Sequence, residues 1–421
     1  MSAALPSYGA PRLDQGPPLA IPASFFLTAP VAIVAAGVLV LVYGGALQSR
    51  WTGPAFAVAH LGTLGLLGAT MLGALYQLIP VLGGTPVPGV RLAHAVHALF
   101  VGGLAALVAR FCGAPPPFGW GGAAALTGAI TLFAGPVAVA LARAPSRTWP
   151  VVGMRAAALA LVVALLLGLR LAVPPLSPLR PLWIQVHLTV GLLGWVGGLV
   201  AAVAWQLVPM FYLVPAFDRR LPAVVLALQV VGVVGPLGVL ALAEAGVDVG
   251  SGAALVAAAP AALAVWGIAP AALLHGLVRR KRAGADGSVR FWFAALPVAL
   301  ALGPLALAAW ALPDPRWALA FGWLAIWGWA GTIVHGMLTR IVPFLTWFHR
   351  FSPLLGKRRV PAMRALYPDV RVRIGLALHV GTTLAGLVAI LLRVAWPAGL
   401  GLVVTGGWLG WHLVATLRRR P

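Results

Sequence analysis

Acidic side chains are nearly missing from this sequence, which has seven Asp and Glu among 421 residues, against 29 Lys and Arg. The seven lie in the tail, in loops or at the end of an apolar stretch. The sequence therefore offers no paired carboxylates for acid–base catalysis and no carboxylate for a proton pathway, and we expect no proton pumping. Its one cysteine, Cys112, excludes an internal disulfide and a cysteine-ligated metal site, and without Cys-x-x-Cys-His a covalent c-type heme is excluded too.

Charged residues of both signs make up only 9% of the chain, whereas 61% are hydrophobic and the mean hydropathy is +0.99. This composition is that of an integral membrane protein. Because about 20 apolar residues cross a bilayer core, we predict twelve transmembrane helices. They cover residues 20–43, 54–83, 91–112, 121–142, 150–173, 181–214, 221–243, 252–278, 290–312, 315–348, 371–394 and 396–417.

The positive charges predict the orientation in the membrane. With a cytoplasmic N-terminus, 23 of the 29 Lys and Arg lie on the inner side and six on the outer side. The positive-inside rule then places both termini in the cytoplasm, in a bacterial-type inner membrane. We attribute the net charge of +22 to a basic surface that faces anionic lipid, and not to a nucleic-acid partner. Residues 1–19 are expected to form a disordered cytoplasmic tail, and residues 20–421 a single membrane domain.

A motif recurs near the end of three of these helices: Tyr-Gln-Leu-Ile-Pro at 76–80, Trp-Gln-Leu-Val-Pro at 205–209 and Thr-Arg-Ile-Val-Pro at 339–343. The closing prolines are 129 (209 − 80) and 134 (343 − 209) residues apart, nearly a third of the chain. Such spacing predicts internal repeats. The fold class that we predict is all-α, with the twelve helices in three four-helix arcs around a pseudo-threefold axis.

Histidines within the predicted helices are the candidate functional residues, because an imidazole in a membrane usually faces a partner, a cavity or a metal. His60 and His187 both lie six residues into long helices that start on the outer side. Their position within the membrane has two explanations: they bind a heme or a metal, or they form hydrogen bonds between helices. An inner group consists of His94, His97, His335 and His379, of which His94 and His97 share a helical face and are candidate metal ligands.

Neutral imidazoles on facing helices can hold a heme within a bundle. The glycines that follow His60, at positions 62, 65, 68 and 73, remove bulk that a flat macrocycle would meet, and they suit close helix packing equally well. His60, His187, His335 and His379 are therefore the candidate cofactor-binding residues.

Twelve helices with both ends inside, a threefold repeat, and motif helices at positions 2, 6 and 10 together resemble subunit I of the heme-copper oxidases. Relatives of that subunit include the nitric-oxide reductase large subunit and the heme-copper membrane proteins of the nitric-oxide response. The resemblance implies that His60 ligates a low-spin heme and that His187 belongs to a copper site.

This sequence departs from that family at two places: residues 221–243 contain no histidine pair, and the His-x-His of the tenth helix is absent. We therefore expect a heme-binding redox, gas-binding or electron-transfer protein without ordinary oxidase catalysis. The sequence leaves open whether copper is bound and whether a cytochrome or other redox subunit is a partner. The alternative is a transporter or metal-handling permease whose histidines line a central pathway.

Overall fold

The computed structural model describes residues 15–173, 177–281 and 286–421, so most of the predicted tail lies outside the described residues. Every regular element within these ranges is a helix, and twelve spans are long and apolar enough to cross a membrane. The predicted all-α membrane fold is thus confirmed. In chain order the spans contain α1 (Ala20–Val42); α2 (Gly53–His60) and α3 (Ala69–Leu78); α4 (Ala93–Phe111); α5 (Pro116–Arg143); α6 (Trp149–Ala172); α7 (Arg180–Thr189) and α8 (Gly197–Tyr212); α9 (Arg220–Glu244); α10 (Ala253–Ala262) and α11 (Ala269–Val278); α12 (Val289–Ala311); α13 (Arg316–Trp323) and α14 (Thr332–Arg350); α16 (Asp369–Leu392); and α17 (Trp396–Leu417).

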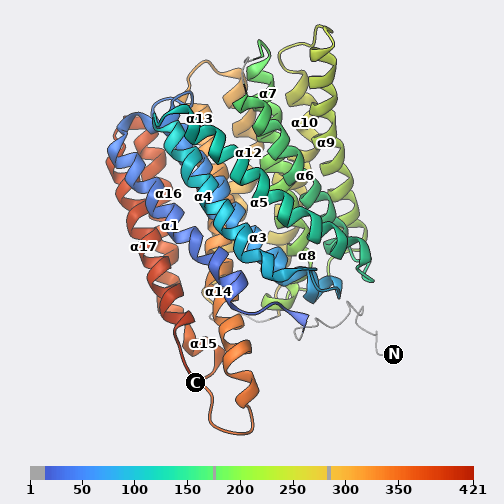
Figure 1. Ribbon diagram of the computed structural model, residues 1–421, viewed down its shortest axis with the longest axis vertical. Coiled ribbons are helices and arrows are strands. Elements are labelled where there is room, and N and C mark those ends of the chain that lie inside the picture. The colour runs from blue at the N-terminus through green and yellow to red at the C-terminus, as the bar shows by residue number, and fades with distance from the viewer. Residues whose placement is uncertain (1–14, 174–176, 282–285) are drawn as a thin grey trace.

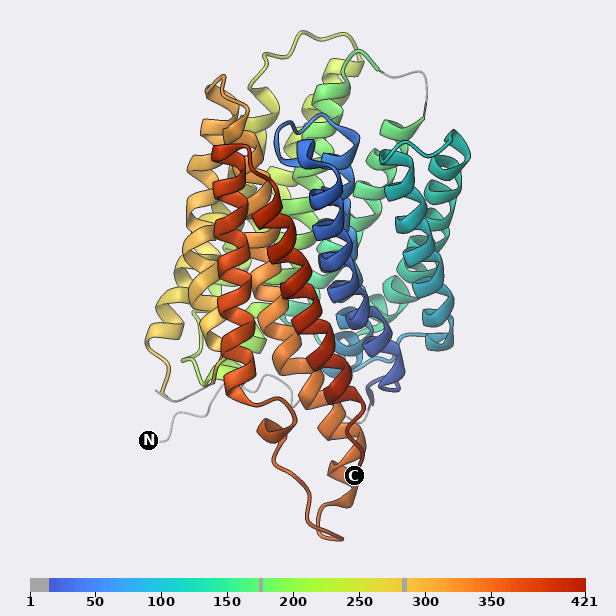
Figure 2. The same ribbon diagram turned by 90° about the vertical axis from the view of Figure 1, so that its left-hand side faces the viewer.

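The helices run along the long axis of the molecule, and α1 begins at the same end at which α17 finishes (Figures 1 and 2). We call this the terminal end and the opposite one the distal end. The tenth span, Arg316–Leu354, is 39 residues long, the longest of the twelve. Its α14 and the loop behind it, which carries the short α15 (Met363–Leu366), project beyond the other helices at the terminal end (Figure 2).

Packing between the spans repeats with a period of four. Spans 3 to 6 touch in sequence, each span packing on the next, as do spans 7 to 10 and the set formed by spans 11, 12, 1 and 2. The three arcs join through equivalent contacts of spans 2 with 3, 6 with 7, and 10 with 11. The arcs predicted from the proline spacing are therefore present, and span 12 packing on span 1 closes them into a ring.

Each motif helix also contains a π-helical segment, which the sequence analysis did not predict. The segments are η3 (Leu61–Gly68), η6 (Val190–Val196) and η8 (Leu324–Gly331). All three begin 19 residues before the motif proline (80 − 61, 209 − 190 and 343 − 324). Because a π-helix shifts the backbone hydrogen-bond pattern and often marks a functional site, this shared register identifies these segments as the conserved core of each repeat unit.

One glycine in each π-segment lets the preceding span approach closely. A Cβ on Gly65 would clash with Ala32 of span 1, and a Cβ on Gly194 would come within 2.9 Å of the Cβ of Ala160 in span 5. Gly328 likewise faces span 9. Small residues allow helices to approach this closely. The close approach adds van der Waals packing, which helps to hold helices together in lipid, where the hydrophobic effect does not drive their association.

The ring closes where α17 packs on α1 through small residues. A Cβ on Gly406 would lie 2.8 Å from the carbonyl oxygen of Pro30, and one on Gly37 would lie 2.6 Å from the carbonyl oxygen of Gly399. These distances are below normal van der Waals contact, so the two backbones touch directly.

We expect Gly406→Leu to lower the free energy of unfolding by about 1–3 kcal/mol or more, because the added side chain must separate α17 from α1. Gly407→Leu is the matched control, since Gly407 is exposed and has nothing within 4 Å of its would-be Cβ. SDS-induced unfolding in mild detergent measures both. Equal midpoints for the two variants would contradict this account of the ring closure.

Candidate functional site

Buried polar side chains are distributed very unevenly among the three repeats. Of the 15 such residues among the described part of the chain, ten lie on α14, α16 and α17. They are Thr332, His335, Thr339, Thr346, His379, Thr382, Thr383, Thr405, His412 and Thr416. Polar groups are costly to bury inside a membrane and usually serve a function there. The concentration therefore marks spans 10 to 12 as the part of the ring that carries a candidate site.

At the centre of this region two histidines from different helices contact each other. His335 of α14 is fully buried and His379 of α16 is 3% exposed. Their Nδ1 atoms are 3.1 Å apart, and their rings meet edge to face at 5.1 Å. Nε2 of His379 lies 2.9 Å from the carbonyl oxygen of Trp327, whereas Nε2 of His335 is buried without a partner.

The hydrogen bonds fix which nitrogen carries each proton when both rings are neutral. A carbonyl oxygen only accepts, so Nε2 of His379 must be its N–H and its Nδ1 must be an acceptor. Nδ1 of His335 therefore donates to His379. The remaining nitrogen of His335, Nε2, then has a bare lone pair in the protein interior.

The carbonyl that His379 satisfies belongs to the π-segment, and the second repeat has the same arrangement. Gln229 of α9 donates its Nε2 to the carbonyl oxygens of Leu193 and Gly194, at 3.0 and 3.1 Å. Leu193 and Trp327 both lie 16 residues before their motif proline (209 − 193 and 343 − 327). His379 therefore occupies the place of Gln229 in its repeat, and its first role is to satisfy the irregular backbone.

Side chains that can carry protons continue from the histidine pair towards the terminal end. Burial raises the pKa of Tyr367, which keeps its phenol protonated. That ring lies 5.7 Å from the ring of His412, and both the Tyr367 hydroxyl and Nδ1 of His412 are buried without a partner. Thr416 donates to the carbonyl oxygen of Leu366. We call the residues Thr339, Thr346, Tyr367, His412 and Thr416 the polar seam.

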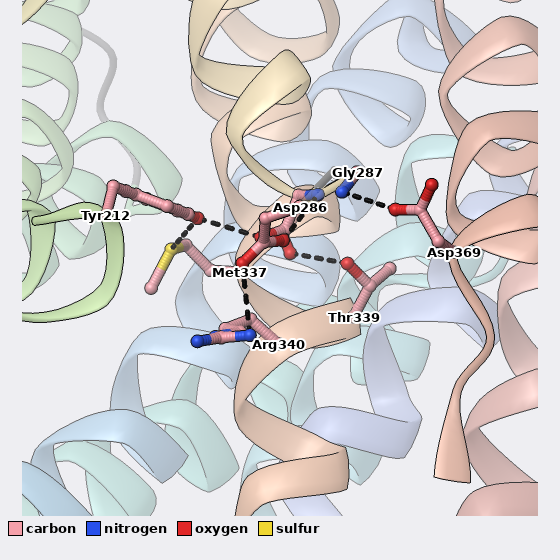
Figure 3. A network of polar contacts seen from close by, with 9 residues as sticks. Tyr212, Asp286, Gly287, Met337, Thr339, Arg340 and Asp369 are labelled. Atoms are coloured by element: carbon pink, nitrogen blue, oxygen red, sulfur yellow. Dashed lines mark hydrogen bonds and ion pairs between the residues drawn. The ribbon is translucent and has the colours of Figure 1, made fainter. Parts of the chain in front are cut away.

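A second polar network lies beside the middle of α14 (Figure 3). Arg340 pairs with Asp286 at 3.0 Å, and Asp286 accepts from the Ser288 hydroxyl at 2.6 Å. Tyr212 contacts the same hydroxyl at 3.1 Å, while Asp369 accepts from an amide of the loop before α12. Four helices, α8, α12, α14 and α16, thus meet through one set of hydrogen bonds. Arg340 stands where the other repeats have glutamine, so only this repeat has a charge at the position.

His60 and His187 form a separate candidate site at the distal end. Nδ1 of His60 donates to the carbonyl oxygen of Phe56 at 2.7 Å, and Nδ1 of His187 to that of Ala164 at 3.0 Å. Each bond leaves Nε2 as the metal-binding nitrogen, an arrangement typical of iron-ligating histidines. The two half-buried side chains are near enough to interact electrostatically. Their chemistry fits the binding of a metal at Nε2, which the resemblance implies as heme ligation for His60 and as part of a copper site for His187.

The inner group of histidines does not assemble as one site. His94 is exposed, and Nε2 of His97 is hydrogen-bonded to the Thr28 hydroxyl at 2.9 Å. His379 uses both nitrogens in hydrogen bonds, so we do not assign it or His335 to a heme. In the part of the chain that is described, no group of three His, Cys, Asp or Glu side chains could hold a metal ion.

Glycines of the second span lie in close contact with neighbouring helices. A Cβ on Gly62 would clash with Ile326 and would lie 3.2 Å from the Trp327 ring, both in span 10. Gly73 similarly faces Phe25 and Phe26 of α1. Of the two explanations that the sequence left open for these glycines, close packing is the one that the contacts support.

Comparisons with known proteins add no assignment: no protein-family model matches the sequence, and no curated protein matches it either.

Two substitutions of His379 separate its backbone role from its other properties. We expect His379→Leu to lower the free energy of unfolding by about 1–3 kcal/mol, because it removes the acceptor of His335 and a donor to Trp327. His379→Gln should cost about 1 kcal/mol or less, since Gln229 makes the equivalent bond in the second repeat.

SDS unfolding of both variants in the same detergent provides the measurement. If the two variants lost the same stability, the hydrogen bond to the π-segment would not be what His379 contributes.

Proposed function

We propose that this chain is a heme-binding membrane protein in which His60 and His187 ligate the iron at the distal end. The observation that carries the proposal is their shared geometry, with Nδ1 bonded to a backbone carbonyl and Nε2 left for a metal. Iron held in this way would supply one-electron transfer, and a small gas such as oxygen or nitric oxide would bind only in place of one of the two histidines.

The chain orients the two imidazoles before any ligand binds. The carbonyl of Phe56 fixes the tautomer of His60, and the Phe111 ring lies 5.0 Å from that imidazole and shields one side of it from water. Span 5 does the same for His187: it provides the Ala164 carbonyl, and Gly168 leaves room for the ring, because a Cβ there would lie 3.2 Å from Cε1 of His187. Such fixed second contacts raise the basicity of a histidine ligand and limit its rotation.

The remaining parts of the proposal follow the resemblance and the charge distribution. The protein would lie in a bacterial-type inner membrane, with the basic terminal end in the cytoplasm. A cytochrome or another redox subunit would exchange electrons with it, and copper near His187 stays open. Ordinary oxidase catalysis is not part of the proposal, because the histidines of a binuclear centre are missing from spans 7 and 10.

Transport is the less favoured alternative. Spans 2 and 10 are in direct contact, with Ile326 and Trp327 filling the space beside Gly62. A cavity between spans 5, 6 and 7, lined by Gly198 and Gln229 among others, has a volume of about 10 Å³, which is room for a single water molecule.

An absorption spectrum of protein purified from a heme-replete host tests the proposal. We expect a Soret band, with α and β bands after reduction by dithionite, and the loss of these bands in His60→Ala and in His187→Ala. His275→Ala is the matched control, because His275 is an exposed histidine near the terminal end of α11. A folded wild-type protein without absorbance, or His60→Ala and His187→Ala variants that keep the bands, would refute the assignment.

A further inference from the structure

We propose that Nε2 of His335 is a proton-accepting site within the third repeat, separate from the heme site and reached from the terminal end. The inference goes beyond the proposed function and does not depend on it. It rests on the lone pair of Nε2 in His335. The hydrogen bonds of the histidine pair leave this nitrogen without a proton, and it is buried without a partner.

A proton is the ligand that fits this nitrogen. The ring of His335 packs at 4.9 Å against that of Phe291, and a Cβ on Gly375 would come within 3.2 Å of Nε2. The nitrogen is thus enclosed by close contacts. A metal ion would need further ligands, and the described residues offer no third metal-binding side chain. A proton requires neither added space nor further ligands.

The uptake step is a simple acid–base reaction. The proton forms a bond with the lone pair of Nε2 and makes His335 an imidazolium, while Nδ1 keeps its hydrogen bond to His379. The proton comes from water at the terminal end, and no electron moves. Because Nε2 of His379 is already protonated and bonded to the carbonyl of Trp327, the charge has no relay beyond the pair and stays on it.

The surroundings of His335 favour access from one side. Towards the distal end the pair meets the carbonyl oxygen of Trp327 in η8, a residue that is 2% exposed. On the terminal side Thr339, a member of the polar seam, lies about one helical turn beyond His335 on α14. The ionisable side chain in contact with His335 is His379 of α16. Tyr212 of α8 contacts Met337, and the Asp286–Arg340 pair lies beside the same stretch of α14 (Figure 3). Arg371 of α16 and His412 of α17 lie near enough to each other to interact electrostatically. α12 contributes the uncharged Phe291.

The other repeats show that the fold does not require a histidine here. His335 lies eight residues before its motif proline, and the equivalent positions hold Leu72 and Ala201 (343 − 335, 80 − 72 and 209 − 201). A leucine therefore suits this register of the repeat. His335→Leu removes the proposed acceptor while keeping a side chain that the first repeat already uses.

Nitrogen-15 NMR of the full-length protein, labelled at histidine and held in lipid, tests the site. At neutral pH we expect, beside any non-protonated Nε2 resonances of His60 and His187, a further one that is absent from His335→Leu and present in His379→Gln. On acidification it should be replaced by a protonated imidazolium signal, and it should return at neutral pH.

Two results would overturn the proposal: an Nε2 of His335 that is protonated at every pH, or one that stays bare throughout the acidic range in which the protein remains folded. The measurement reads the nitrogen directly and does not use heme absorbance. A failure here and a failure of the heme assignment are therefore distinguishable.

Discussion

The backbone of a membrane protein must satisfy its own hydrogen bonds, because lipid offers it no partner. Most of this chain does so with regular helices. The π-segments, which the three motif helices share with the eighth span (η7, Leu263–Ile268), depart from this pattern, and in the motif helices they expose carbonyl oxygens to neighbouring spans. Gln229 of the seventh span donates to the π-segment of the second motif helix, and His379 of the eleventh span donates to that of the third. The need for a donor at this point places a polar side chain deep in the bundle, and His335 pairs with it.

Much of the fold could be predicted from the sequence, because hydropathy and charge act locally. Apart from the start of the fourth span and the end of the tenth, the predicted helix bounds fall within two residues of the observed ones. The proline spacing also predicted the three arcs. The π-segments were missed, since a segment such as Leu61–Gly68 has the same apolar composition as a regular transmembrane helix. Alignment of the three repeats on their prolines would have been the signal, because the segments share one register.

The candidate site was predictable only in part. Sequence position placed His60 and His187 near the same end, as the structure has them, and it placed His335 and His379 at similar depth. It could not show that the latter two rings touch, because they are separated by 44 residues and depend on how α14 packs on α16. It also grouped His94 and His97 with them by depth alone. Equal depth in the membrane does not bring two residues together. Whether they share a site also depends on which helices pack side by side and on which faces of those helices meet.

The closed ring also bears on how the molecule can change shape. In a linear stack of repeats, a terminal unit has one free side and can swing away by breaking a single interface. Here each arc is held on both sides by the contacts of spans 2 with 3, 6 with 7 and 10 with 11, and the arc that contains both chain ends is held together by the direct backbone contact of α17 with α1. No arc can tilt without distorting its packing contacts with both neighbouring arcs. Adjustments therefore require the least distortion as movements of side chains and protons, and spans 10 to 12 are the ones rich in side chains that can make them.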